Sequence, residues 1–141
     1  MKNSIKLITL LLGLILVFGT SCKKYEEGPN ISLLSKKSRL VNKWKPDRSV
    51  DEFGNDDALS QEAKDGVIFE FKKNNTFTIK YNFPGYSDLE SGTWEFTDKK
   101  EKIVLTYLDD GEAYVYTILL LKKNELGLKD TSGYKTYFIT K

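Results

Sequence analysis

The sequence predicts an all-β fold, in which about eight antiparallel strands form an up-and-down meander that closes into a small barrel, with one short N-terminal helix. Two observations predict it. From residue 41 onward, apolar and polar side chains alternate in short runs, which is the period of a half-buried strand. After residue 66, short turn segments rich in Asn, Asp, Gly and Lys separate the runs, so each strand pairs with the next. Closing such a meander removes its unpaired edges.

A short helix comes first, because Ile31, Leu34 and Val41 follow one another at roughly helical spacing. The clearest strand pair lies further along the chain, where alternation resumes at Phe77 after a turn at Asn74–Asn75. Pro84–Gly85 marks the next break. The later turns are expected at Lys99–Lys100, Asp110–Gly111, Asn124–Glu125 and Ser132–Gly133. The expected strands are residues 41–50, 67–71, 76–83, 92–96, 103–108, 114–121, 126–128 and 134–140.

The strand at residues 114–121 is apolar on both faces. One face carries Tyr114, Tyr116, Ile118 and Leu120, and the other carries Val115, Leu119 and Leu121. Both faces therefore need cover. The helix that begins at Ile31 can pack outside this strand. Alternatively, the strand presents an exposed surface to a partner or a second copy of the chain.

The N-terminal segment has the parts of an export signal: Lys2 and Lys6, then the uncharged residues 7–18, then small residues before Cys22. The uncharged stretch is too short to span a bilayer comfortably as a mature helix. Residues 19–22 resemble the lipobox of bacterial lipoproteins, in which the cysteine thiol is diacylated and the bond before it is cleaved. We therefore expect a lipoprotein signal peptide at residues 1–21, a lipidated tether at 22–30 and the barrel domain at 31–141.

The residues after Cys22 indicate where such a lipoprotein goes. Lys23 stands where many lipoproteins retained in the inner membrane have Asp, so by resemblance the lipid anchor lies in the cell outer membrane. Residues 24–27 loosely resemble the signals that send Bacteroidota lipoproteins to the cell surface. A periplasmic and a surface-facing orientation therefore both stay open.

The composition excludes several classes of function. Cleavage removes only Lys2 and Lys6 among the charged residues, which leaves 20 basic and 20 acidic side chains, so the charge gives no reason to expect a nucleic-acid partner. The chain has no histidine, and Cys22 is its only cysteine. Ser-His-Asp and Cys-His catalysis, histidine-rich metal sites and a disulfide framework are therefore excluded. We expect neither an enzyme nor a cofactor.

Acidic residues gather in two segments. Asp109, Asp110 and Glu112 flank a glycine, as is typical of a hairpin turn, although a carboxylate-based hydrolase would also need paired acids. Residues 51–57 offer oxygen atoms of the kind that bind Ca²⁺, but they lack the EF-hand spacing and its closing Glu. We interpret this segment as a solvated loop without a metal. Residues 59–64 then predict a short helix that can act as a lid at the barrel mouth.

Three motifs resemble those of lipocalin-like proteins. Residues 40–44 are similar to their opening Leu-x-Gly-x-Trp signature, with Asn42 in the place of Gly. Residues 71–77 are similar to their Phe-x-x-x-Gly-Thr-Phe hairpin, with Asn75 in the place of Gly, and residues 91–96 are similar to their Gly-x-Trp strand. Over the whole domain the chain resembles lipocalin-like domain lipoproteins of Bacteroidota. The resemblance implies a small β-barrel that binds a hydrophobic ligand or a partner, with no shared catalytic residues.

Aromatic and aliphatic side chains that face inward are candidates to line a ligand cavity, although they can equally fill the barrel. The leading prediction is a membrane-anchored protein that binds a small hydrophobic or amphipathic ligand. The alternative is a non-enzymatic interaction module that binds a protein partner in a cell-envelope complex. The candidate cavity residues are Trp44, Phe69, Phe71, Phe77, Ile79, Tyr81, Trp94 and Phe96.

Overall fold

The computed structural model describes residues 25–27 and 33–141. The predicted signal peptide, Cys22 and the predicted tether, apart from residues 25–27, lie outside the described residues. The strands are β1 (Lys43–Val50), β2 (Asp56–Asp57), β3 (Val67–Phe71), β4 (Thr76–Phe83), β5 (Tyr86–Thr97), β6 (Lys102–Tyr107), β7 (Ala113–Leu121), β8 (Glu125–Lys129) and β9 (Lys135–Thr140). The helices are α2 (Lys36–Leu40), α3 (Gln61–Gly66) and the 3₁₀ turn η1 (Asp98–Lys100).

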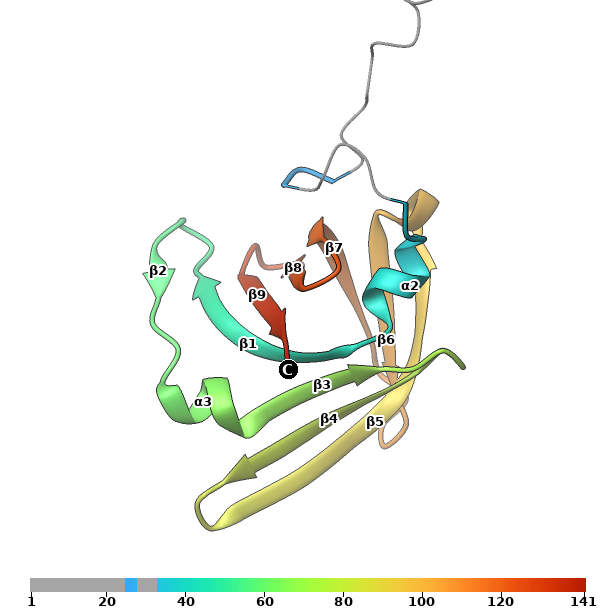
Figure 1. The fold of residues 1–141 in the computed structure, drawn as a ribbon. Helices are drawn as coiled ribbons and strands as arrows, with labels where there is room; N and C mark the ends of the chain where they lie inside the picture. The colour runs from blue at the N-terminus through green and yellow to red at the C-terminus, as the bar shows by residue number, and fades with distance from the viewer. Residues whose placement is uncertain (1–24, 28–32) are drawn as a thin grey trace, which may run out of the picture.

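The described strands form one antiparallel sheet that closes on itself (Figure 1). Their order is β2-β1-β3-β4-β5-β6-β7-β8-β9, and β1 also pairs with β9. Eight strands therefore form a closed up-and-down barrel in sequence order, while the short β2 adds to β1 outside the ring. The predicted fold class is confirmed.

Strand β1 closes the barrel by pairing with two other strands. Near its start Trp44 lies opposite Phe69 of β3, whereas its pairing with β9 continues to Val50, which lies opposite Lys135. A β-bulge follows Pro46, a residue that has no N–H to donate to the ladder. β1 therefore curves away from β3, and α3 contacts both strands in the space between them (Figure 1).

The two ends of the barrel carry different connections. The closed end carries α2 and the turns at residues 72–75, 98–101 and 122–124. The mouth carries residues 51–66 and the turns at 84–85, 108–112 and 130–134. At the closed end Leu40 and Trp44 are completely buried, and Trp44 Nε1 donates a hydrogen bond of 2.9 Å to the Leu40 carbonyl oxygen.

The short described segment before α2 also packs on the barrel. The Tyr25 hydroxyl donates to the carbonyl oxygen of Lys100 in η1 at 3.0 Å, and the Tyr25 side chain is buried with the core. Two residues later, Glu27 N donates to the Leu119 carbonyl oxygen at 2.8 Å. The chain at Tyr25 therefore lies at the closed end, beside η1.

The main core fills the barrel interior, and one glycine makes room for it. A Cβ atom at Gly92 would lie 2.1 Å from the Thr106 carbonyl oxygen and 2.6 Å from the Phe77 ring. The Phe77 ring therefore occupies the space that a side chain at position 92 would need, which is the physical reason for the glycine of the Gly-x-Trp motif. The completely buried large side chains of this core are Trp44, Phe71, Phe77, Leu40, Ile79, Ile103, Leu105, Leu121 and Leu126.

The two asparagines at glycine positions of the family motifs differ in backbone conformation. Asn75, in the turn between β3 and β4, has φ of 64°, in the left-handed region that glycine and asparagine tolerate best. Asn42 is not among the described residues with positive φ. Its Nδ2 atom donates to the Lys123 carbonyl oxygen at 3.4 Å. A glycine's conformational freedom is therefore needed at position 75 and not at position 42.

Helix α2 is shorter than the helix expected from residue 31 onward. Ser35 caps its start, because the Ser35 Oγ atom accepts a hydrogen bond of 3.0 Å from Ser38 N. Leu33 and Leu34 precede the helix, and the Leu33 side chain is fully exposed. No helix in the described part of the chain is long and apolar enough to cross a membrane.

The outer side of β7 is covered differently from the expectation. Helix α2 reaches only the end of β7, where Arg39 Nη1 donates to the Leu121 carbonyl oxygen. Leu119 forms a separate buried cluster with Val50 and Tyr137. The predicted cover by the helix is therefore wrong for Leu119, because Val50 of β1 and Tyr137 of β9 pack against it.

Candidate ligand-binding site

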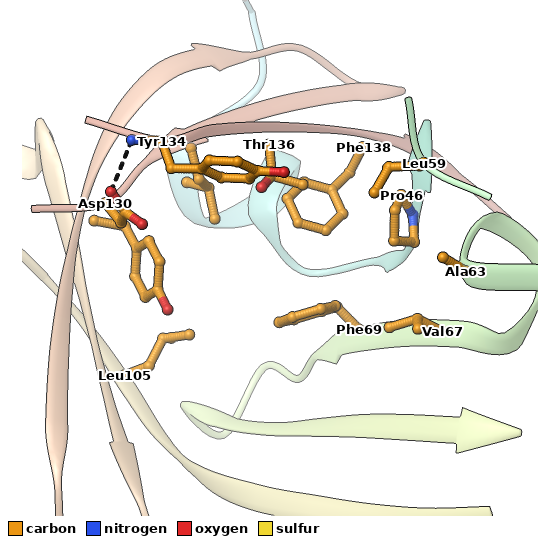
Figure 2. A pocket seen from close by; sticks show the side chains of 12 residues that line it. Pro46, Leu59, Ala63, Val67, Phe69, Leu105, Asp130, Tyr134, Thr136 and Phe138 are labelled. Carbon is orange, nitrogen blue, oxygen red and sulfur yellow. Dashed lines mark hydrogen bonds between the residues drawn. The ribbon is translucent and has the colours of Figure 1, made fainter. Parts of the chain in front are cut away.

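A cavity of about 240 Å³ lies in the mouth half of the barrel, beside α3 and the curved strand β1 (Figure 2). Figure 2 shows Val67 and Phe69 on one wall, Thr136 and Phe138 on the opposite wall, and Ala63 of α3 at the side. Most of the lining is apolar. The complete lining is Pro46, Leu59, Ala63, Val67, Phe69, Leu105, Tyr116, Leu128, Asp130, Tyr134, Thr136 and Phe138.

Strand alternation positions the two facing walls. On β9, Thr136 and Phe138 line the cavity, while Tyr137 between them belongs to the separate cluster with Leu119. On β3, Phe69 lines the cavity from the other side. The Phe69 and Phe138 rings meet edge to face, with centroids 5.2 Å apart and an interplanar angle of 67°. This ring pair joins the β3 and β9 walls where β1 curves away.

Helix α3 closes the side of the cavity where β1 separates from β3. The helix begins after Ser60, whose Oγ atom accepts a hydrogen bond of 3.1 Å from Ala63 N. It therefore lies two residues later than the helix expected at residues 59–64. Ala63 and the preceding Leu59 both contribute to the lining. The role of this segment as a lid stays a prediction.

Asp130 and Tyr134 bring polar atoms to the cavity and also hold the mouth together. The Asp130 Oδ1 atom accepts hydrogen bonds of 2.9 Å from the backbone nitrogens of Gly133 and Tyr134. The Tyr134 hydroxyl donates to the carboxylate of Asp57 in β2, and this hydrogen bond raises the pKa of Tyr134. The turn before β9 is thereby tied to β2 across the mouth.

Tyr116 lines both the cavity and a second hollow of about 260 Å³. Burial raises the pKa of Tyr116 and of Tyr107. A tyrosine hydroxyl is protonated at neutral pH even without such a shift, so both groups can donate hydrogen bonds. Glu90 accepts a hydrogen bond of 3.2 Å from the Tyr81 hydroxyl. The second hollow is polar, and its lining is Glu90, Tyr107, Asp109, Asp110, Tyr114 and Tyr116.

The eight predicted cavity residues lie at different depths in the barrel. Phe69 lines the cavity. Tyr81 reaches Glu90 beside the second hollow, and Phe96 packs half-buried against the core. A ligand contact stays a prediction for all of them. The other five pack in the main core and are at most 3% exposed, namely Trp44, Phe71, Phe77, Ile79 and Trp94.

The other residues that line the cavity are not among the eight candidates predicted from the sequence. Leu105, Leu128 and Phe138 lie on strands that the sequence predicts, so alternation could have placed them inside the barrel. Alternation does not show how far along the barrel axis a side chain lies. Leu59 and Ala63 come from the connection between β2 and β3, where no strand period exists.

The acidic segments use their carboxylates for local structure. Asp51 accepts hydrogen bonds from Asn55 N at 2.8 Å and Phe53 N at 2.9 Å, and the bonds from Asn55 contribute most to lowering the pKa of Asp51. The Asp110 Oδ1 atom accepts from Glu112 N at 2.8 Å, which fits the predicted turn. Within residues 25–27 and 33–141, no group of acidic, histidine or cysteine side chains is arranged to hold a metal ion.

The family model of a lipocalin-like domain matches residues 40–128, which covers the barrel strands from β1 to β8 except the last residue of β8. The chain belongs to the lipocalin-like domain family. None of the curated proteins matches this lipocalin-like chain.

Solved structures show the same lipocalin-like fold. A lipocalin-like protein from Bacteroides uniformis is 17% identical with a TM-score of 0.61, and the match covers 73% of this chain and 99% of that chain. An uncharacterized protein from Bacteroides eggerthii is 16% identical with a TM-score of 0.59, and the match covers 72% of this chain and 99% of that chain. At these identities the likeness shows the fold alone. The cavity therefore lies inside a lipocalin-like barrel.

Proposed function

We propose that this lipocalin-like barrel is a non-enzymatic binding protein for a small amphipathic molecule. The observation that supports the proposal is that one side chain, Tyr116, lines both an apolar cavity and a polar hollow. Apolar surface placed in the cavity leaves water, which is favourable by about 25 cal/mol per Å². A polar group on the same molecule can then reach the Tyr107 hydroxyl and the Glu90 carboxylate in the hollow.

The size of the cavity limits the apolar part of the ligand. Pockets for drug-sized ligands usually enclose about 300–1,000 Å³, so they exceed this cavity. The cavity itself encloses about 240 Å³. The proposed ligand is therefore a small molecule with one compact apolar group and a polar end, and not a long-chain lipid that is buried completely.

A fluorescence titration with N-phenyl-1-naphthylamine, a compact aromatic amine, tests the proposal. Its emission should rise when it enters the cavity of the purified protein. Ala63→Trp should weaken binding by more than about tenfold, because the indole ring would occupy the cavity beside α3. Glu62→Trp is the matched control, since Glu62 is exposed on the same helix and does not line the cavity.

Near-ultraviolet circular dichroism should show that both tryptophan variants keep the wild-type fold. Unchanged affinity of a folded Ala63→Trp variant would contradict the proposed site. Absence of binding to the wild type would contradict the apolar part of the proposal.

We further propose that acyl chains on Cys22 anchor the protein in the cell outer membrane. The uncharged residues 7–18 and the small residues before Cys22 support this proposal. Cys22→Ser should abolish acyl labelling and release the protein from the membrane fraction, whereas Ser21→Ala should leave both unchanged. A Cys22→Ser protein that stays labelled and membrane-bound would overturn it.

A further inference from the structure

Every pair of consecutive lysines in the described chain lies at one end of the barrel. The pairs are contributed by α2 and by the three turns of the closed end, four segments that are far apart in the sequence. Asp98 and Glu101 are the acidic residues within these four segments. The fold therefore gathers basic side chains that the sequence distributes over the whole domain. The pairs are Lys36–Lys37, Lys72–Lys73, Lys99–Lys100 and Lys122–Lys123.

The mouth carries the opposite charge. Within its four connecting segments, Lys64 is the basic residue. The near-zero net charge of the domain thus conceals two ends of opposite sign, separated along the barrel axis. The acidic side chains of the mouth segments are Asp51, Glu52, Asp56, Asp57, Glu62, Asp65, Asp109, Asp110, Glu112 and Asp130.

Many of the closed-end ammonium groups are available to an external anion. Two acidic side chains at this end are partly neutralised, because Asp98 pairs with Lys102 at 3.0 Å and Glu125 pairs with Lys122 at 3.1 Å. Five other lysines at this end are exposed, and none of them forms a salt bridge within the described residues. They are Lys37, Lys73, Lys99, Lys100 and Lys123.

The N-terminal side of the chain meets the barrel at this same end. Tyr25 is buried there with its hydroxyl on Lys100, and the Lys36 ammonium lies 4.3 Å from the centroid of the Tyr25 ring. Lys23 and Lys24 directly precede Tyr25 in the sequence, and the uncharged residues 7–18 precede them. The basic end is therefore the end at which Tyr25 lies, the first described residue after the predicted membrane-directed segment.

We infer that the closed end of the barrel is a docking surface for an anionic lipid bilayer, with the lysines of the four segments facing the lipid phosphates. A flat anionic surface can meet all four segments at once, because they share one end of the barrel. Each basic side chain held near such a surface strengthens binding by about a factor of five. The inference rests on the charge distribution, and it depends neither on a ligand in the cavity nor on acylation of Cys22.

Vesicle co-sedimentation of unacylated residues 23–141 tests the inference. This fragment contains every described element and the whole described core. The match to the Bacteroides uniformis structure covers 99% of that chain, so that barrel is solved with almost no residues beyond the matched domain. The fragment should bind vesicles of equimolar phosphatidylglycerol and phosphatidylcholine, ignore vesicles of phosphatidylcholine alone, and dissociate as salt is raised. The triple variant Lys73→Gln, Lys99→Gln, Lys123→Gln should bind roughly a hundredfold more weakly.

The matched control removes the same number of charges away from the closed end, by Lys64→Gln, Lys80→Gln and Lys129→Gln. It should bind like the wild type, because these residues lie on α3, on β4 and at the mouth end of β8. Equal losses in the two triple variants would overturn the inference, since net charge alone would then explain binding. Failure of the wild type to bind either vesicle would also overturn it, and a basic surface for an acidic protein would take its place.

Discussion

The two tryptophans of the barrel have different hydrogen-bonding environments although both are buried. Trp44 Nε1 donates to the Leu40 carbonyl oxygen at the end of α2. Trp94 Nε1 is buried without a hydrogen-bond partner among the described residues. The Trp94 ring instead packs edge to face with the rings of Phe71 and Phe96, whose centroids lie 6.0 and 5.4 Å from its own. The same side chain therefore has a polar role at one site and an apolar role at the other.

This difference predicts unequal effects of the same substitution. Trp44→Phe leaves the buried Leu40 carbonyl oxygen without its donor, which costs about 1–3 kcal/mol beyond the loss of ring volume. Trp94→Phe loses ring volume but removes an N–H that has no partner. Urea unfolding should therefore show that Trp44→Phe lowers the free energy of unfolding more than Trp94→Phe. Equal losses, or a larger loss for Trp94→Phe, would contradict this account.

At the level of elements, the sequence predicts the barrel strands well because each carries period-two alternation next to a clear turn. Strand β4 is found at the predicted residues, and its turn is set by Asn75. Strand β5 begins at Tyr86, earlier than the predicted residue 92. Its first residues are mostly exposed, so they lack the apolar alternation that would have revealed a strand.

The elements that the sequence predicts poorly are those with little buried surface. Leu33 and Leu34 fit a helical spacing, but they are exposed and the helix starts only after the Ser35 cap. Strand β2 consists of Asp56 and Asp57, which have low strand propensity. It forms because β1 continues beyond its pairing with β3 and leaves that edge open to β2, where Ser49 Oγ donates to the Asp57 carbonyl oxygen at 2.7 Å.

The candidate site shows the same limit on sequence-based prediction. Alternation tells which side chains point into the barrel, so it correctly placed the aromatic residues inside. It does not tell which end α2 closes or where β1 leaves β3. Phe69 lies beside the gap between these strands and lines the cavity, whereas Phe71, two residues further along β3, is part of the packed core.

At the scale of the whole molecule, all eight tyrosines have pKa values raised above their ordinary range. The causes differ. Burial is the largest cause for Tyr25, Tyr81 and Tyr107. The hydrogen bond to the Glu112 carboxylate raises the pKa of the exposed Tyr114 to about 12. The folded protein therefore holds its phenolic protons more tightly than the unfolded chain.

These raised pKa values predict alkaline destabilisation. In the unfolded chain tyrosine ionises near pH 10. Above that pH the folded state binds more protons than the unfolded state, so the free energy of unfolding falls as pH rises from about 10 towards the folded pKa values. Below pH 10 the tyrosines cause no such change. Absorbance of tyrosinate should rise near pH 10 in urea-unfolded protein but at higher pH in the folded protein. Coincident titrations would contradict the prediction.

The pairing of β1 with β9 has a consequence for the order of folding. Trp44 lies opposite Thr140, so the barrel is sealed by a contact between the first barrel strand and the last. Contacts between residues so far apart along the chain form slowly, because the intervening loop must close before they can form. The single cysteine allows no covalent link to hold these strands together. During synthesis, the edges of β1 and β8 therefore stay unpaired until the final residues arrive, and chains that end before β9 expose two strand edges on which other chains can aggregate.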